Sequence, residues 1–159
     1  MFEECRVQGD FTLSSGRRSS VFYDFDLLSP REAANYVDRA LRKFEGSINW
    51  QEIDFVVAPA VGGIVPGFLV SFAKDKPLVI LDKQDAARGP EFKEGCYLIV
   101  DDVITSFQAA NKARKSMSQI STNLKCMGVL AYVFRGALSD LEKQDVPAYY
   151  LSRKEQEHE

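Results

Sequence analysis

The chain has 159 residues, 45% of them apolar and 27% charged, which is ordinary for a globular domain and excludes disorder and collagen-like repeats. Twenty lysines and arginines against 23 acidic residues leave a net charge of −3, which argues against a general nucleic-acid binder. Three cysteines without CxxC spacing and one histidine, His158, argue against zinc sites and histidine-dependent catalytic triads.

The start of the chain and its cysteines predict a cytoplasmic protein. Glu3 and Glu4 disfavour a signal peptide, which needs a basic start and an apolar run. The odd set of thiols is expected to be buried and reduced. The uncharged stretch 55–73 is long enough to span a bilayer, but Pro59, Pro66 and its glycines would break a spanning helix. No membrane partner is therefore expected.

Short apolar runs alternate with helical patterns along most of the chain. Residues 17–25 indicate an extended segment at a sheet edge, and Ser29, Pro30 and Glu32 predict a capped helix that ends at Gly46. Further helices are predicted over residues 64–73, 107–120 and 138–143. Uncharged apolar runs predict buried strands over residues 55–58, 78–81, 97–100, 129–133 and 148–151. The alternation predicts a single α/β domain over residues 1–159, with a mostly parallel central sheet and helices on both faces.

The strand predicted over residues 97–100 runs directly into two carboxylates, Asp101 and Asp102. Neighbouring acids beside a buried strand repel each other and lose hydration, and the hydroxyls of a sugar cis-diol would compensate both. Thr105 and Ser106 then open a helix, whose first N–H groups suit a phosphate dianion. The structural alternative is that Asp102 or Thr105 only caps the helix and that Asp101 faces solvent. The whole run of apolar strand, paired acids and hydroxyl residues is more specific than such a cap.

The run from Val100 to Thr105 resembles the signature of type I phosphoribosyltransferases, and of the orotate phosphoribosyltransferase family in particular. The resemblance implies that Asp101 and Asp102 are catalytic residues that hold the ribose of phosphoribosyl pyrophosphate (PRPP). It also implies that the 5′-phosphate is bound by Thr105, Ser106, Phe107, Gln108 and Ala109. The family usually has glycine at position 107, so Phe107 is expected to narrow this loop and to disfavour a left-handed backbone.

Two further segments extend the resemblance. The turn Ala60, Val61, Gly62 and Gly63 resembles the family's pyrophosphate loop, which binds the leaving pyrophosphate with Mg²⁺ and commonly contains a non-proline cis peptide; by themselves, adjacent glycines are a weak signal. Residues 9–19, continued by residues 21–24, resemble the amino-terminal motif of the orotate enzymes. That match implies a small N-terminal hood in which Phe22 and Tyr23 present backbone groups to the pyrimidine edge.

Arg135 follows the strand predicted over residues 129–133, where the family has an Asp-Arg pair and this chain has Phe134-Arg135. A guanidinium fork suits the planar carboxylate of orotate, so Arg135 is expected to bind the base. The phenylalanine leaves open a phosphoribosyltransferase that acts on a different base.

The resemblance weakens after residue 81, where the family pattern is Arg-Lys-x-x-Lys-x-His-Gly before a long mobile loop. Lys83 matches and is expected to make a catalytic contact with the leaving group, and Arg88, in place of the histidine, is expected to help bind PRPP. Asp82 reverses the charge of the expected arginine, and Ala86 removes the second lysine. Losing one such contact to a developing anion commonly costs ~100-fold or more in rate.

The leading hypothesis is an orotate-type phosphoribosyltransferase that transfers ribose 5-phosphate from PRPP to orotate, forming orotidine 5′-phosphate and releasing pyrophosphate. Mg²⁺ is expected as the cofactor, bound through PRPP near Asp101 and Asp102 without direct protein ligands. The resemblance also implies a homodimer. The alternative is a catalytically weak or inactive module of the same fold that binds PRPP or a nucleotide and serves regulation.

Overall fold

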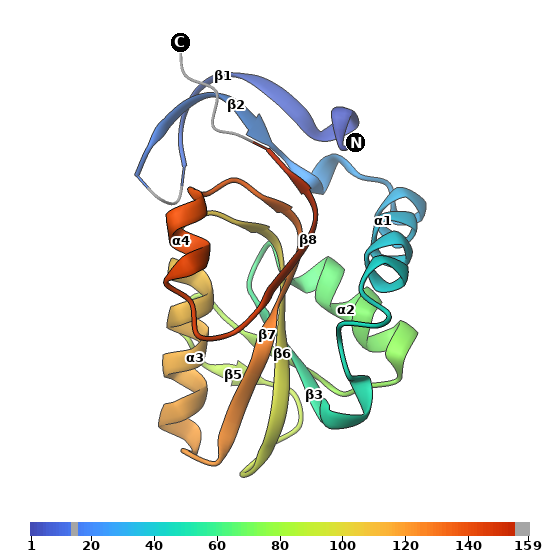
Figure 1. Ribbon diagram of the computed structural model, residues 1–159, viewed down its shortest axis with the longest axis vertical. Helices are drawn as coiled ribbons and strands as arrows, with labels where there is room; N and C mark the ends of the chain where they lie inside the picture. The colour runs from blue at the N-terminus through green and yellow to red at the C-terminus, as the bar shows by residue number, and fades with distance from the viewer. Residues whose placement is uncertain (14–15, 155–159) are drawn as a thin grey trace.

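The computed structural model describes residues 1–13 and 16–154 (Figure 1). Ser14 and Ser15 of the amino-terminal motif, and His158, lie outside the described residues. Within the described part of the chain, no helix combines the length and the apolar character needed to cross a membrane. The uncharged stretch 55–73 instead forms a strand, a glycine turn and a helix.

A six-stranded sheet forms the centre of the molecule, and all neighbouring strands are parallel except the edge pair β4–β5. In spatial order the strands are β5 (Ala87–Arg88), β4 (Leu78–Leu81), β3 (Phe55–Pro59), β6 (Gly95–Ile104), β7 (Leu124–Phe134) and β8 (Ala148–Arg153). The predicted α/β fold with a mostly parallel sheet is confirmed. Because parallel strands end on the same side, the segments that follow β3, β4 and β6 meet at one edge of the sheet.

Helices cover both faces of this sheet (Figure 1). Helices α1 (Pro30–Lys43) and α2 (Ile64–Lys74) lie on one face, and α3 (Gln108–Ile120) and α4 (Leu138–Glu142) lie on the other. The predicted capping box is present, because the Glu32 N–H donates to Ser29 Oγ at 3.1 Å and the Ser29 N–H donates to Glu32 Oε1 at 2.9 Å. The predicted start of α1 is confirmed, although the helix ends at Lys43, before Gly46.

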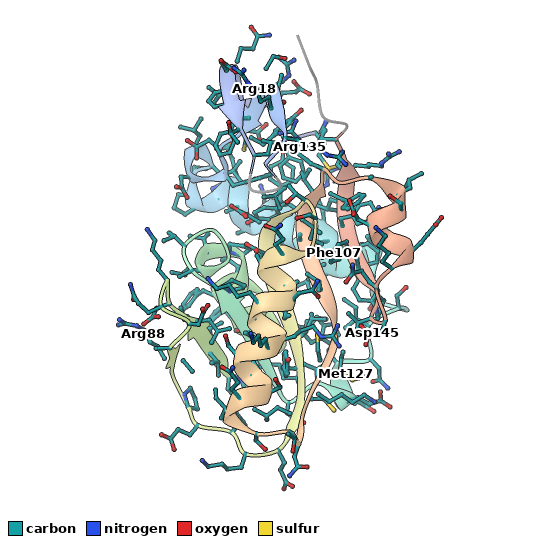
Figure 2. The ribbon with its side chains drawn as sticks, turned by 90° about the vertical axis from the view of Figure 1, so that its left-hand side faces the viewer. Arg18, Arg88, Phe107, Met127, Arg135 and Asp145 are labelled. Carbon is teal, nitrogen blue, oxygen red and sulfur yellow. The ribbon has the colours of Figure 1, made fainter. Side chains whose placement is uncertain are left out.

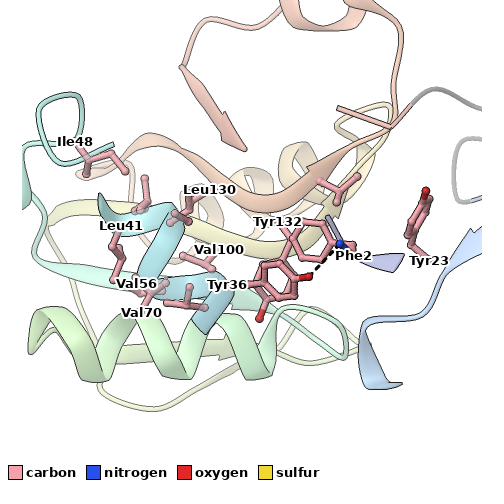
Figure 3. Close-up of a cluster of buried hydrophobic side chains, with 14 of the residues drawn as sticks. Phe2, Tyr23, Tyr36, Leu41, Ile48, Val56, Val70, Val100, Leu130 and Tyr132 are labelled. Atoms are coloured by element: carbon pink, nitrogen blue, oxygen red, sulfur yellow. Dashed lines mark hydrogen bonds between the residues drawn. The ribbon is translucent and has the colours of Figure 1, made fainter. Parts of the chain in front are cut away.

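A two-stranded antiparallel hairpin, β1 (Arg6–Thr12) and β2 (Arg18–Tyr23), forms the hood at one end of the sheet (Figure 1). Three 3-10 turns complete the fold: η1 (Glu3–Cys5), η2 (Phe25–Leu27) and η3 (Trp50–Glu52). Phe2, Tyr23 and Tyr36 share one buried cluster with side chains of β6 and β7, and the Phe2 N–H donates to Tyr36 Oη at 3.0 Å (Figure 3). The hood is therefore packed onto the core.

Strands β6 and β7 are longer than their apolar runs predicted. The ladder continues past Val100, pairing Asp101 with Ala131 and Ile104 with Phe134. Main-chain hydrogen bonds do not depend on side-chain polarity, so a strand extends through polar residues when a partner strand is present. The consequence is that Asp101 and Asp102 lie within a rigid strand.

Candidate functional site

At the acidic strand end, Asp101 and Asp102, each carboxylate accepts a hydrogen bond from the backbone N–H of the next residue. The Asp102 N–H donates to Asp101 Oδ1 at 2.8 Å, and the Val103 N–H donates to Asp102 Oδ1 at 2.7 Å. Both residues are half-buried. These two bonds use one oxygen of each carboxylate.

The electrostatics of the pair favour an added donor or cation. Burial raises the pKa of the Asp101 carboxyl well above its ordinary range, and the adjacent Asp102 charge raises it further. Burial also raises the pKa of Asp102. Hydrogen bonds from the Asp101 side chain and from nearby backbone N–H groups partly oppose this rise. Two acids held this close disfavour full ionisation, and hydroxyl donors or a cationic ligand would relieve that cost.

The glycine turn between β3 and α2 packs directly against the acidic strand end. A Cβ on Gly62 would overlap the Asp102 carboxylate, and one on Gly63 would lie 2.7 Å from the Pro59 and Val100 carbonyl oxygens. Only residues without a side chain allow this approach. The peptide bond between Ala60 and Val61 is cis, as the resemblance implied. The two segments therefore form one continuous site at the ends of β3 and β6.

Phe107 corrects a prediction, because its backbone is left-handed, with φ of 66°, despite its side chain. Its ring is 3% exposed and lies in the core cluster on the α3 face, 6.2 Å from the Phe134 ring (Figure 2). Burying a phenyl ring contributes ~1.5–3 kcal/mol, which offsets the ~1–2 kcal/mol cost of the left-handed backbone. The ring therefore points into the core, and the expected narrowing of the loop is not seen.

The loop 105–109 carries a buried hydroxyl that lacks a hydrogen-bond partner among the described residues, Ser106 Oγ. Buried hydroxyls are almost always hydrogen-bonded, so Ser106 Oγ is suited to bond to a ligand bound at this loop. A phosphate oxygen would supply the acceptor at the start of α3. Gln108 and Ala109 form the exposed first positions of that helix.

A cleft of about 230 Å³ lies beside this loop, between the ends of β3 and β4 and the first turns of α3. It brings together three residues that sequence analysis selected from three separate segments: Ala60, Lys83 and Ala109. The cleft is smaller than the ~300–1,000 Å³ of drug-sized sites, which suits a compact polar group such as a phosphate.

The segment after β4 folds back as a short turn, residues 82–88, which we call the lid turn. Asp82 Oδ1 accepts from the Gln84 N–H at 2.9 Å and the Ala86 N–H at 3.0 Å, and Asp82 Oδ2 accepts from Arg88 Nε at 3.3 Å. The hydrogen bond from the Ala86 N–H, helped by those from the Gln84 N–H and Arg88, lowers the pKa of Asp82 and outweighs burial, which raises it. Thus the residue that reverses the expected charge organises the turn.

Sequence analysis overlooked one cation in the cleft wall, Lys112 of α3, whose Nζ lies 3.4 Å from Asp85 Oδ2 in the lid turn. Its spacing from Gln108, four residues earlier and so one helical turn away, was the only available signal. Arg88, expected to bind PRPP, lies on the exposed side of the turn, paired with Asp82.

The predicted base-binding residues lie together at the hood. Phe22 is 40% exposed, whereas Tyr23 is buried with the Arg135 guanidinium 5.1 Å above its ring. Arg135 is only 2% exposed; Nη1 donates to the Val21 carbonyl oxygen at 3.0 Å and Nη2 to Ser19 Oγ at 3.3 Å (Figure 2). In this arrangement Arg135 connects β7 to the hood, and its contact with a base stays a prediction.

Comparison with curated proteins finds relatives that are named orotate phosphoribosyltransferase. The chain is 28% identical over 156 residues to an orotate phosphoribosyltransferase of Pyrococcus furiosus, covering 94% of this chain and 86% of the relative. It is 31% identical over 144 residues to the orotate phosphoribosyltransferase of Sulfurimonas denitrificans, covering 86% of this chain and 69% of the relative. No protein-family model matches the chain.

Comparison with solved structures finds the same fold. A crystal structure of Mycobacterium tuberculosis orotate phosphoribosyltransferase in complex with PRPP superimposes with a TM-score of 0.74 at 20% sequence identity. The match covers 96% of this chain and 91% of that chain. At this identity the similarity shows a shared fold, and the type I phosphoribosyltransferase fold expected from sequence is confirmed.

Proposed function

The chain belongs to the orotate phosphoribosyltransferase family of transferases, and from this premise we propose that it transfers ribose 5-phosphate from PRPP to orotate. The observation that carries the proposal is the contact between Gly62 and the Asp102 carboxylate. It joins the turn assigned to pyrophosphate with the acids assigned to ribose, so the two halves of PRPP would bind on either side of the bond to be broken.

The reaction needs charge stabilisation more than a nucleophile from the protein. The bond from C1 of the ribose to the pyrophosphate oxygen breaks, with its electron pair leaving on pyrophosphate. The deprotonated ring nitrogen of orotate forms the new bond to C1. Positive charge develops on the ribose between these events, and Asp101 and Asp102 are positioned to hold the ribose hydroxyls and stabilise that charge.

Mg²⁺ fits this site as an ion carried by the substrate. Among residues 1–13 and 16–154, no group of three or more His, Cys, Asp or Glu side chains gathers around a common point. Mg²⁺ commonly takes one or two carboxylates together with substrate phosphates and waters. Asp101 and Asp102, whose pKa values are raised by burial, would accept such an ion nearby, and bound Mg²⁺ would neutralise the pyrophosphate charge.

For the base, we assign the hood and Arg135. Phe22 and Tyr23 lie on β2, which has a strand partner on one edge only within the described residues. Its second edge offers backbone groups to a planar pyrimidine. Arg135 would exchange its bonds to Ser19 and Val21 for the orotate carboxylate, a shift of the hood that a charged ligand can drive.

We further propose a cytoplasmic homodimer. All three cysteines are free thiols, which is typical of a reducing compartment. Four large apolar side chains, Val61, Val65, Phe68 and Phe72, are 53–80% exposed and follow one side of α2 from the pyrophosphate turn. Such a stripe matches a second copy of itself about a twofold axis. Phe72→Glu should halve the sedimenting mass at micromolar concentration, whereas a monomeric wild type would contradict the dimer.

The transfer is tested by incubating the protein with PRPP, Mg²⁺ and orotate while following the loss of orotate absorbance. Turnover is the expected result. Tight PRPP binding without turnover would favour the regulatory module instead. Turnover with another pyrimidine or purine alone would retain the transferase and reassign the base site at Phe134-Arg135.

A further inference from the structure

The cleft beside the phosphate loop has a balanced set of charges. The lid turn contributes Asp82, Lys83 and Asp85 to its wall, and α3 contributes Lys112. Pyrophosphate carries several negative charges, so its binding depends on which of these groups are available to it. The lid turn has fewer cations than the family pattern, because Asp82 and Ala86 stand where that pattern has arginine and lysine.

The carboxylate of Asp82 is already hydrogen-bonded within the lid turn. Its two oxygens accept three hydrogen bonds, from the Gln84 and Ala86 N–H groups and from Arg88 Nε. These bonds hold its negative charge at the base of the turn, where donors surround it. Asp82 therefore shapes the turn, and its repulsion of an anion in the cleft is largely screened by its donors.

Lys112 is held less firmly than Asp82, by a single exposed ion pair within the described residues. Its side chain is 62% exposed, and within the described part of the chain it pairs at 3.4 Å with Asp85, whose side chain is 37% exposed. Exposed ion pairs of this kind contribute little to stability, because solvent screens them. A ligand with several negative charges would therefore displace Asp85 readily. Because Ala60 and Lys112 line the same cleft, the ammonium lies beside the turn assigned to pyrophosphate.

We propose that Lys112 supplies a second cation to the cleft, beside Lys83 of the lid turn, and that its Nζ binds the pyrophosphate of PRPP in exchange for Asp85. The inference rests on the proposed function, since it assigns a contact to that reaction's leaving group. An ammonium on a four-carbon stem has three donors and the reach to follow a moving anion. In the family pattern this cationic contact would come from the lysine expected at position 86 of the lid turn. In this chain it would come from Lys112 of α3.

The test measures pyrophosphate and PRPP binding by calorimetry, with Mg²⁺ present, for wild type, Lys112→Gln, Lys115→Gln and Asp85→Asn. Lys115 is the matched control, since it has the same charge and lies on the same helix but lines a different cavity. Lys112→Gln should lower the affinity for both ligands by ~10-fold or more, as expected for a lost hydrogen bond to a charged group. Lys115→Gln should change them by less than ~2-fold, because its charge is exposed and screened.

Asp85→Asn separates a ligand contact from a structural one. If Lys112 binds pyrophosphate, removing its competing partner should tighten binding, while Lys112→Arg should retain most of the wild-type affinity. If Lys112 only anchors the lid turn, Asp85→Asn and Lys112→Gln should weaken binding alike, which would overturn the inference. Equal binding by Lys112→Gln and Lys115→Gln would overturn it too, leaving the proposed function intact. A wild type that binds neither ligand would remove both.

Discussion

The acidic strand end and the lid turn differ in how each is held in place. Asp101 and Asp102 lie inside a strand paired with β7, with the glycine turn packed against them. The lid turn lies at the sheet edge, where β5 comprises only two residues. Two N–H groups of the turn donate to one half-buried aspartate, Asp82. The segment proposed to bind the pentose is therefore built into the core. The lid turn, proposed to lie over the leaving group, can change without disturbing the fold.

The largest effect is expected from Asp102→Asn. Removing one preorganised charge beside the developing cation should lower transfer by ~100- to 1,000-fold in a steady-state assay with PRPP and orotate. Asp38→Asn, on the exposed side of α1, is the control and should leave the rate unchanged. An active Asp102→Asn enzyme would break the assignment of the acidic strand end.

Phe107→Gly restores the residue that the family pattern has and tests why this chain can do without it. Losing the buried ring and gaining an easier left-handed backbone should leave a net loss of about 2–3 kcal/mol in the free energy of unfolding. Urea denaturation measures this loss, with the exposed Leu27→Ala as the control. Unchanged stability would mean that the ring does not anchor the loop.

Gly62→Ala sharpens the link between the glycine turn and the acids. The added Cβ would displace the Asp102 carboxylate, so PRPP affinity should fall by ~10-fold or more. Gly46→Ala is the matched control, because its Cβ would meet no atom within 4 Å. Calorimetry with PRPP compares the two, and equal affinities would show that the contact is unimportant.

Asp101→Asn should stabilise the protein at neutral pH while impairing the site. Since the folded-state pKa of Asp101 is raised, ionisation costs the folded state more than the unfolded chain. Tm should rise by roughly 2–4 °C at pH 7, the shift that ~1 kcal/mol gives in a domain of this size. The gain should vanish below about pH 4, where the carboxyl is protonated in both states. A lower Tm at pH 7 would contradict this account.

Asp82→Ala should have the smallest and most local effect. Amide hydrogen exchange at Gln84 and Ala86 should accelerate by ~10-fold, while strands β3 and β6 keep their protection. Because the pKa of Asp82 is lowered in the fold, its stabilisation is present at neutral pH and is lost as the pH falls through that value. Glu91→Ala, in the loop that follows, is the control, and a global loss of protection would argue against a local role.

Sequence reasoning predicted most of the elements, because apolar periodicity and capping residues act over a few neighbouring positions. The capping box at Ser29 and the buried run 97–100 are examples. It was wrong about Phe107, since the ring's partners, such as Phe134, lie far along the chain. It also missed Lys112, because no local pattern shows that α3 passes beside the lid turn.

The sequence by itself determined that an apolar strand ends in two acids, followed by hydroxyls and a helix, and that glycines follow an earlier strand. Those are properties of adjacent residues. Only the tertiary structure decided that Gly62 contacts Asp102, that Phe107 buries its ring, and that Arg135 bonds to the hood. These contacts join residues from 27 to 116 positions apart in the chain, and their positions depend on how the sheet and helices pack rather than on neighbouring residues.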